Sequence, residues 1–160
     1  MKMKREIIQL AQDGEVLFES ERLIYRKIDA RDAEQILKMD SNPSVLRYLY
    51  IPPAKGIEDA LGYVQNIRKQ YEDNGTGRLA VVDKLSQTFI GWAGIKFHTD
   101  LMDGKSHFYE LGYRFLPEYW NQGYGSEAAV NMAIFAFTVL EVPSLVGSAH
   151  VDHGSSNRLL

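Results

Sequence analysis

The segment that decides the fold spans residues 109–128 and reads YELGYRFLPEYWNQGYGSEA. Its first part continues a run of β-forming residues, 108–116, that predicts a strand. Glycines at positions 123 and 125 then lead into an apolar run, 126–140, that predicts a helix. A strand, a glycine loop and a helix in this order would present backbone N–H groups and the positive end of the helix dipole to a phosphate group.

Two common phosphate-binding motifs do not fit this loop. A Walker loop needs Gly-Lys-Ser/Thr, and the dinucleotide fingerprint needs a third glycine, although Asp152 would suit its acidic position. The β-rich runs 79–82, 89–97 and 108–116 are also joined by short turns. They predict an antiparallel meander rather than parallel strands with helical crossovers.

The remaining elements follow from hydrophobic periodicity and helix boundaries. We expect helices at 3–12, after Asp29 as far as Asn42-Pro43, and at 57–71 with Asn74-Gly75 as its end. A first strand at 22–28 and a last strand at 145–151 complete the sheet. A further helix begins at Ser155 and the chain ends one turn later, so we expect a single domain over 1–160 that is truncated at its C-terminus.

Composition and charge limit the function classes. The formal net charge of -3 gives no general attraction to nucleic acid or to anionic membranes, and we expect neither as a partner. The absence of cysteine excludes disulfides and a thiol nucleophile. The N-terminus carries no signal sequence, so we expect a soluble, cytoplasmic protein.

A metal site is not expected from the histidines. His150 and His153, with Asp152 between them, span a strand end and a loop and do not share a face. We expect His98 and His107 at the surface of a hairpin.

The segment 110–128 resembles the coenzyme-binding core of the GCN5-related N-acetyltransferase (GNAT) superfamily. The similarity is greatest to the branch of ribosomal-protein N-terminal acetyltransferases, in which Gly-Tyr, Pro-x-Tyr-Trp and Gly-x-Gly/Ala-x-Glu-Ala follow one another. Residues 90–95 resemble the preceding strand of that family and residues 21–26 its opening strand. His153-Gly154-Ser155-Ser156 departs from the Asn-x-x-Ser that the family often has before its last helix.

The resemblance implies a fold and a set of cofactor contacts. The implied fold is α/β (α+β): a mixed, mostly antiparallel sheet flanked by helices, with a splayed strand pair that forms the acyl-CoA groove. Acetyl-CoA would be the acyl donor. Strand amides at Phe115 and Leu116 would hold its pantetheine and carbonyl, and loop amides would hold its pyrophosphate; the loop residues are Gln122, Gly123, Tyr124, Gly125 and Ser126.

The resemblance also implies direct acetyl transfer to an amine, with Glu110 as the candidate base. Two interpretations of Glu110 stay open, because an isolated strand glutamate is commonly a solvent-facing residue paired with a cation. We expect the acceptor to be a protein or peptide N-terminal α-amine, with a polyamine or an amino sugar as the alternative. A non-catalytic acyl-CoA-binding module and a homodimer are further possibilities.

Overall fold

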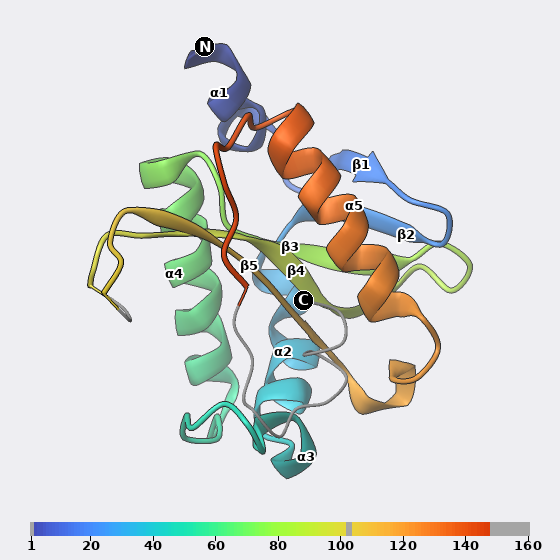
Figure 1. The fold of residues 1–160 in the computed structure, drawn as a ribbon. Helices are drawn as coiled ribbons and strands as arrows, with labels where there is room; N and C mark the ends of the chain where they lie inside the picture. Colours follow the sequence, from blue (N-terminus) through green and yellow to red (C-terminus); the bar gives the residue numbers. More distant parts are fainter. Residues whose placement is uncertain (1, 102–103, 148–160) are drawn as a thin grey trace.

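The computed structural model describes residues 2–101 and 104–147, with side chains from residue 6 onward. Five of its strands form one antiparallel sheet in the order β1-β2-β3-β4-β5 (Figure 1). They are β1 (Val16–Glu19), β2 (Leu23–Lys27), β3 (Arg78–Asp83), β4 (Thr88–His98) and β5 (Phe108–Phe115). The predicted antiparallel meander is therefore confirmed.

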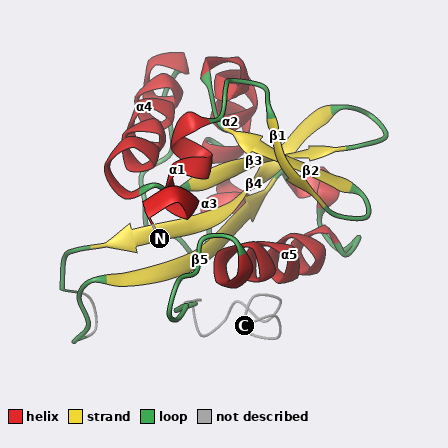
Figure 2. Ribbon diagram, turned by 90° about the horizontal axis from the view of Figure 1, so that it is seen from above, coloured by secondary structure: helices red, strands yellow, loops and turns green. Residues whose placement is uncertain are grey.

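Helices cover both faces of this sheet, with α2 and α4 on one side and α5 on the other (Figure 2). The helices are α1 (Lys2–Leu10), α2 (Ala33–Asp40), α3 (Pro43–Leu46), α4 (Ile57–Asn74) and α5 (Tyr124–Thr138). The predicted α+β class, with a mostly antiparallel sheet between helices, is confirmed.

Tyr71 shows how the predicted face of α4 is used. The helix buries Ala60, Val64, Ile67 and Tyr71 against the sheet. The Tyr71 hydroxyl donates to the Arg78 carbonyl and accepts from the Ile28 N–H at 3.0 Å, so it joins β3 to the end of β2. Burial raises the pKa of this hydroxyl, which keeps it protonated and able to donate.

Two of the differences from the predicted helix boundaries have a clear local cause. Pro43 was expected only to stop a helix, but it also starts α3, because the Asn42 side chain caps the Ser44 N–H at 2.9 Å. Helix α5 begins at Tyr124, two residues before the predicted start, because Gly123 adopts a left-handed φ of 83° and turns the chain into the helix.

The segment that follows α5 pairs with β5 at one isolated bridge. Val146 forms a parallel bridge with Glu110, in which the Val146 N–H donates to Tyr109 and the Leu111 N–H donates to Val146. Within the described residues, no strand flanks β5 on this side from Gly112 to Phe115. Residues 148–160 lie outside the described residues, and with them the rest of the predicted strand 145–151, His150, Asp152, His153 and the helix predicted at Ser155.

Gly91 offers a direct test of how closely β4 and β5 approach each other. It lies where the β3–β4 register shifts, and a Cβ at this position would sit 2.2 Å from the Arg114 carbonyl oxygen. Because that contact is with backbone, Gly91→Ala should lower the free energy of unfolding by about 1–3 kcal/mol in urea titrations.

Gly62→Ala is the matched control for this change. No atom lies within 4 Å of a Cβ at position 62 in the middle of α4, so alanine should raise stability by up to about 1 kcal/mol. A Gly91→Ala protein as stable as the wild type would contradict the close approach of the two strands.

Candidate active site

The N-terminus of α5 is the first part of the candidate site. The first turn of a helix leaves its N–H groups without intrahelical partners, here those of Tyr124, Gly125 and Ser126. Within the described residues, the cap residue Gly123 supplies no side-chain hydrogen bond to them. A Cβ at Gly125 would meet only Tyr113 Cε2, at 3.7 Å, so neither packing nor a left-handed φ explains that glycine.

Glu127, one turn into α5, connects the glycine loop to the turn between β1 and β2. Its carboxylate accepts hydrogen bonds from Ser20 Oγ at 2.6 Å, Arg22 N at 2.7 Å and Arg22 Nε at 2.8 Å. Arg22 Nη1 also donates to the Gln122 carbonyl at 2.9 Å, and its guanidinium stacks on the Tyr124 ring at 4.2 Å. The turn between β1 and β2 therefore fixes the position of the glycine loop.

The Glu127 carboxyl is stabilised as a carboxylate. Burial raises its pKa, but the hydrogen bonds from Ser20 and Arg22 act in the opposite direction and outweigh burial, so the pKa lies below its ordinary value. The hydrogen bond between the Arg22 and Glu127 side chains also raises the pKa of Arg22, so both members of the pair stay charged.

The second part of the candidate site is the side of β5 that no described strand covers from Gly112 to Phe115. Hydrogen bonding alternates along a strand, so the Phe115 N–H points to the same side as the Leu111 N–H, away from β4. The Leu116 N–H instead donates to the Ile90 carbonyl at 3.0 Å, within the sheet. Trp120 Nε1 donates to the Phe115 carbonyl at 2.9 Å and holds the loop against the strand end.

Glu110 lies in the middle of a group of charged side chains, on the face of β5 that points away from α5. Its Oε2 is 2.6 Å from His98 Nε2 and 3.8 Å from Arg78 Nη2, and its side chain is 17% exposed. Glu110 thus lies near cations, as the second interpretation expected, but it does not face solvent; its role as the base stays a prediction. His98 was expected at the surface and is instead only 11% exposed, because its ring stacks on Phe108 and bonds Glu110.

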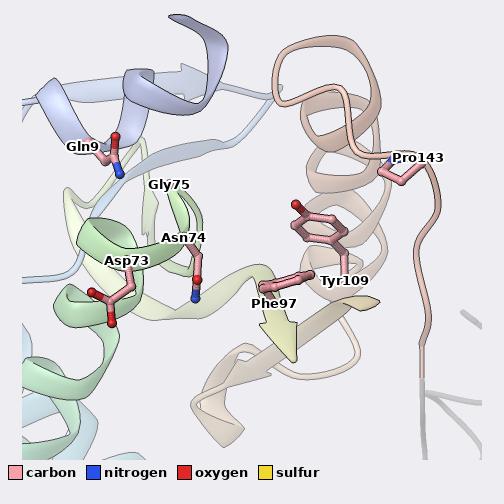
Figure 3. A pocket seen from close by; sticks show the side chains of 7 residues that line it. All are labelled: Gln9, Asp73, Asn74, Gly75, Phe97, Tyr109 and Pro143. Carbon is pink, nitrogen blue, oxygen red and sulfur yellow. The ribbon is translucent and has the colours of Figure 1, made fainter. Parts of the chain in front are cut away.

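A cavity in the described part of the chain lies away from these residues. It measures about 500 Å³ and lies beside the Phe97 and Tyr109 rings, with Pro143 and the end of α4 around it (Figure 3). The ring centroids of Phe97 and Tyr109 are 4.8 Å apart. None of the predicted site residues lines this cavity, and we do not assign it to the reaction.

Arg22, Arg78 and His98 are the site residues that sequence reasoning missed. Arg22 and Glu127 are separated by 105 positions and Arg78 and Glu110 belong to strands that do not pair with each other, so no local spacing connects them. Side chains alternate between the two faces along β4 and β5, and the register of this hairpin pairs even-numbered positions of one strand with even-numbered positions of the other. That alternation could have placed His98 and Glu110 on one face.

Metal binding and membrane crossing find no support in the described part of the chain. No three His, Asp or Glu side chains of residues 6–101 and 104–147 gather in a way that could hold a metal ion. None of the described helices combines the length and apolar character that a bilayer crossing requires.

The chain belongs to the GNAT family of N-acetyltransferases, because the family described as acetyltransferase (GNAT) domain matches residues 22–160. In sequence it is similar to the uncharacterized N-acetyltransferase YoaA of Bacillus subtilis (strain 168). Identity is 31% over 144 residues, which cover 90% of this chain and 79% of YoaA.

Two solved acetyltransferases share the fold at 19% identity. The ribosomal-protein-S5-alanine acetyltransferase from Vibrio fischeri superposes with a TM-score of 0.70 over 89% of this chain and 79% of its own. The spermidine N-acetyltransferase from Vibrio cholerae, in complex with CoA and spermine, gives 0.69 over 88% and 78%. One fold thus serves acceptors of different chemistry.

The Glu127 contacts predict a stability that depends on pH. Because the folded-state pKa of Glu127 is lowered, its contribution is present above the ordinary carboxyl value and is lost as the pH falls through the folded value. Glu127→Gln should reduce the free energy of unfolding by about 1–3 kcal/mol at pH 7, and this difference should shrink below about pH 4.

Glu21→Gln serves as the control, because Glu21 is exposed and adjacent to Arg22. Denaturant titrations at pH 7 and pH 3.5 compare the two variants with the wild type. An equal, pH-independent loss in both would disprove the role of the Glu127 carboxylate.

Proposed function

We propose that this chain transfers the acetyl group of acetyl-CoA directly to an amine, and that the amine is the N-terminal α-amine of a protein or peptide. One observation carries the proposal. The uncapped, glycine-led start of α5 meets the free side of β5, and the same strand carries the Glu110 carboxylate.

The first turn of α5 suits a pyrophosphate. Its N–H groups and the helix dipole favour an anion, and the open space at Gly125 lets a ligand approach the backbone. In this proposal the amides of Gln122 to Ser126 hold the diphosphate. The guanidinium of Arg22 adds a positive charge behind the loop, although Glu127 neutralises most of its field.

The thioester arm would run along β5. The Phe115 N–H, directed away from β4, can donate to the pantetheine or to the thioester carbonyl. Leu116 would contribute its buried side chain and the chain reversal that follows, because its N–H already bonds Ile90.

Glu110 would act as the general base. It takes one proton from the ammonium form of the acceptor, and the freed amine lone pair forms the new C–N bond at the thioester carbonyl. The C–S bond breaks, the sulfur leaves as a thiolate, and the second nitrogen proton neutralises that thiolate. The products are the amide, CoA and a protonated Glu110, which returns its proton to water.

The phosphate part of this proposal predicts that Gly125→Glu prevents cofactor binding. A carboxylate in the first turn of α5 would occupy the position of the diphosphate and repel it, so the CoA affinity should fall by roughly 100-fold or more in calorimetry. The fold should survive, because a negative charge at a helix N-terminus is favourable.

Gly125→Ala separates bulk from charge. A methyl group at this position makes only an ordinary contact with Tyr113, so this variant should stay folded and keep most of its CoA affinity. If Gly125→Glu bound CoA as tightly as the wild type, the loop would not be the phosphate site.

The catalytic part predicts that Glu110→Gln lowers kcat by roughly 100-fold at pH 7 and leaves acetyl-CoA affinity unchanged. The defect should diminish at high pH, where more of the acceptor is already a neutral amine. Release of the CoA thiol measures the rate with peptide, polyamine and amino-sugar acceptors. Full activity in Glu110→Gln would remove this residue as the base.

The exposed Glu58 at the start of α4 provides the control variant Glu58→Gln. It should match the wild type in rate and in cofactor affinity. Tight acetyl-CoA binding without turnover on any amine would favour the non-catalytic binding module instead.

A further inference from the structure

Two buried arginines lie over one tryptophan on the face of the sheet that α2 and α4 cover. The guanidinium carbons of Arg78 and Arg114 lie 4.6 and 5.1 Å from the centre of a Trp92 ring. Their side chains are only 13% and 15% exposed. We call Arg78, Trp92 and Arg114, with the carboxylates Asp40 and Glu110, the Arg78 cluster.

Two paired glycines let Arg78 reach Glu110 across an intervening strand. Arg78 on β3 pairs with Gly94 on β4, which in turn pairs with Gly112 on β5. The guanidinium lies directly over Gly112, where a Cβ would come within 3.0 Å of Nη1 and 3.2 Å of Nη2. Arg78 can therefore lie beside Glu110 because the two glycines between them have no side chains to fill that space.

The two arginines differ in how well they are paired. Arg114 Nη1 donates to Asp40 Oδ1 at 2.7 Å. Arg78 Nη2 stands 3.8 Å from Glu110 Oε2, too far for a hydrogen bond, and Glu110 already bonds His98. Arg78 is thus the less satisfied cation of the cluster.

Two hydrogen-bond donors of the Arg78 cluster are buried without a partner in the described part of the chain. They are Arg78 Nη1 and Trp92 Nε1. A buried donor without an acceptor is unfavourable, more so when it is charged. Burial also lowers the pKa of Arg78, which shows the cost of its desolvation. Tyr63 also faces Arg78 and Arg114, but among the described residues no acceptor satisfies Arg78 Nη1.

We propose that Arg78 binds the carbonyl or carboxylate oxygen of an α-aminoacyl acceptor while the amine of the same acceptor meets Glu110. The inference rests on the proposed function, in which Glu110 receives the proton. It makes Arg78 the residue that selects acceptors with an oxygen next to the amine-bearing carbon.

The spacing of the two groups fits this class of acceptor. In an aminoacyl group the nitrogen and the carbonyl oxygen are roughly 3 Å apart by standard bond lengths. Arg78 Nη2 and Glu110 Oε2 are 3.8 Å apart, so one aminoacyl group can face both. A polyamine has no oxygen for Arg78 and would bring further positive charge to two buried arginines.

Paired acceptors test the proposal. L-alanine N-methylamide carries the carbonyl oxygen, L-alanine carries a carboxylate, and 2-aminopentane has a chain of equal length without oxygen. The wild-type kcat/KM for each is compared with that of Arg78→Met. The ratio of amide to 2-aminopentane should fall roughly 10- to 100-fold in the variant, because any change in the basicity of Glu110 affects both acceptors and cancels in the ratio.

Two further variants keep the result interpretable. Lys96 pairs with Glu110 in register, so Lys96→Met removes a charge beside Glu110 and leaves Arg78 in place. It should leave the amide preference unchanged. Arg78→Lys keeps the charge but loses the forked donors, and it should give an intermediate loss with normal acetyl-CoA affinity.

The outcomes are distinct. An amide preference that falls in Arg78→Met and Arg78→Lys but not in Lys96→Met supports the proposal, and the alanine arm then tells a peptide site from an amino-acid site. Equal losses on all three acceptors would reduce Arg78 to a structural or electrostatic neighbour of Glu110 and overturn the inference alone. A wild-type protein that acetylates none of the acceptors would overturn the proposed function together with it.

Discussion

The contact between the Glu127 carboxylate and the turn of Ser20 and Arg22 determines the geometry of the glycine loop. Three hydrogen bonds to one carboxylate join the start of α5 to the β1–β2 turn, and the Arg22 bond to Gln122 extends this link to the loop. Because Glu127 bonds outward to the sheet, it does not cap the helix. The first N–H groups of α5 are thus held in position, but no side-chain cap of the described residues accepts a hydrogen bond from them.

The sequence predicted the elements whose information is local. The strand-forming runs 79–82, 89–97 and 108–116 and the amphipathic stretch at 57–71 all form where expected, since period and turn residues lie within each segment. Strand β1 was missed because it is only four residues long and shows an irregular pattern of exposure. Arg22 and Arg78 could not be predicted, because Arg22 bonds a helix residue 105 positions away and Arg78 meets Glu110 across an intervening strand.

In the proposed function, strand β5 would carry both the cofactor contacts and the base, on different sides of one backbone. Successive side chains alternate between the two faces, so Glu110, Gly112 and Arg114 face α2 and α4, while Tyr113 lies near α5. The amides of alternate residues point to the side away from β4. A cofactor along this edge and an acceptor on the α2–α4 face would therefore meet at the same strand. The candidate base comes with the strand, without a further loop to position it.

In the proposed mechanism, the Arg78 cluster would also link acceptor binding to proton transfer. The negative charges near Arg78 and Arg114 are those of Glu110 and Asp40, and Asp40 is bonded to Arg114. When Glu110 takes a proton, Arg78 loses the negative charge that faces it in a buried environment, which is unfavourable. An acceptor oxygen at the Arg78 guanidinium would replace part of that interaction at the step in which it is lost. Binding of the acceptor oxygen by Arg78 and acceptance of the proton by Glu110 would thus favour each other. Neither residue could produce this coupling alone.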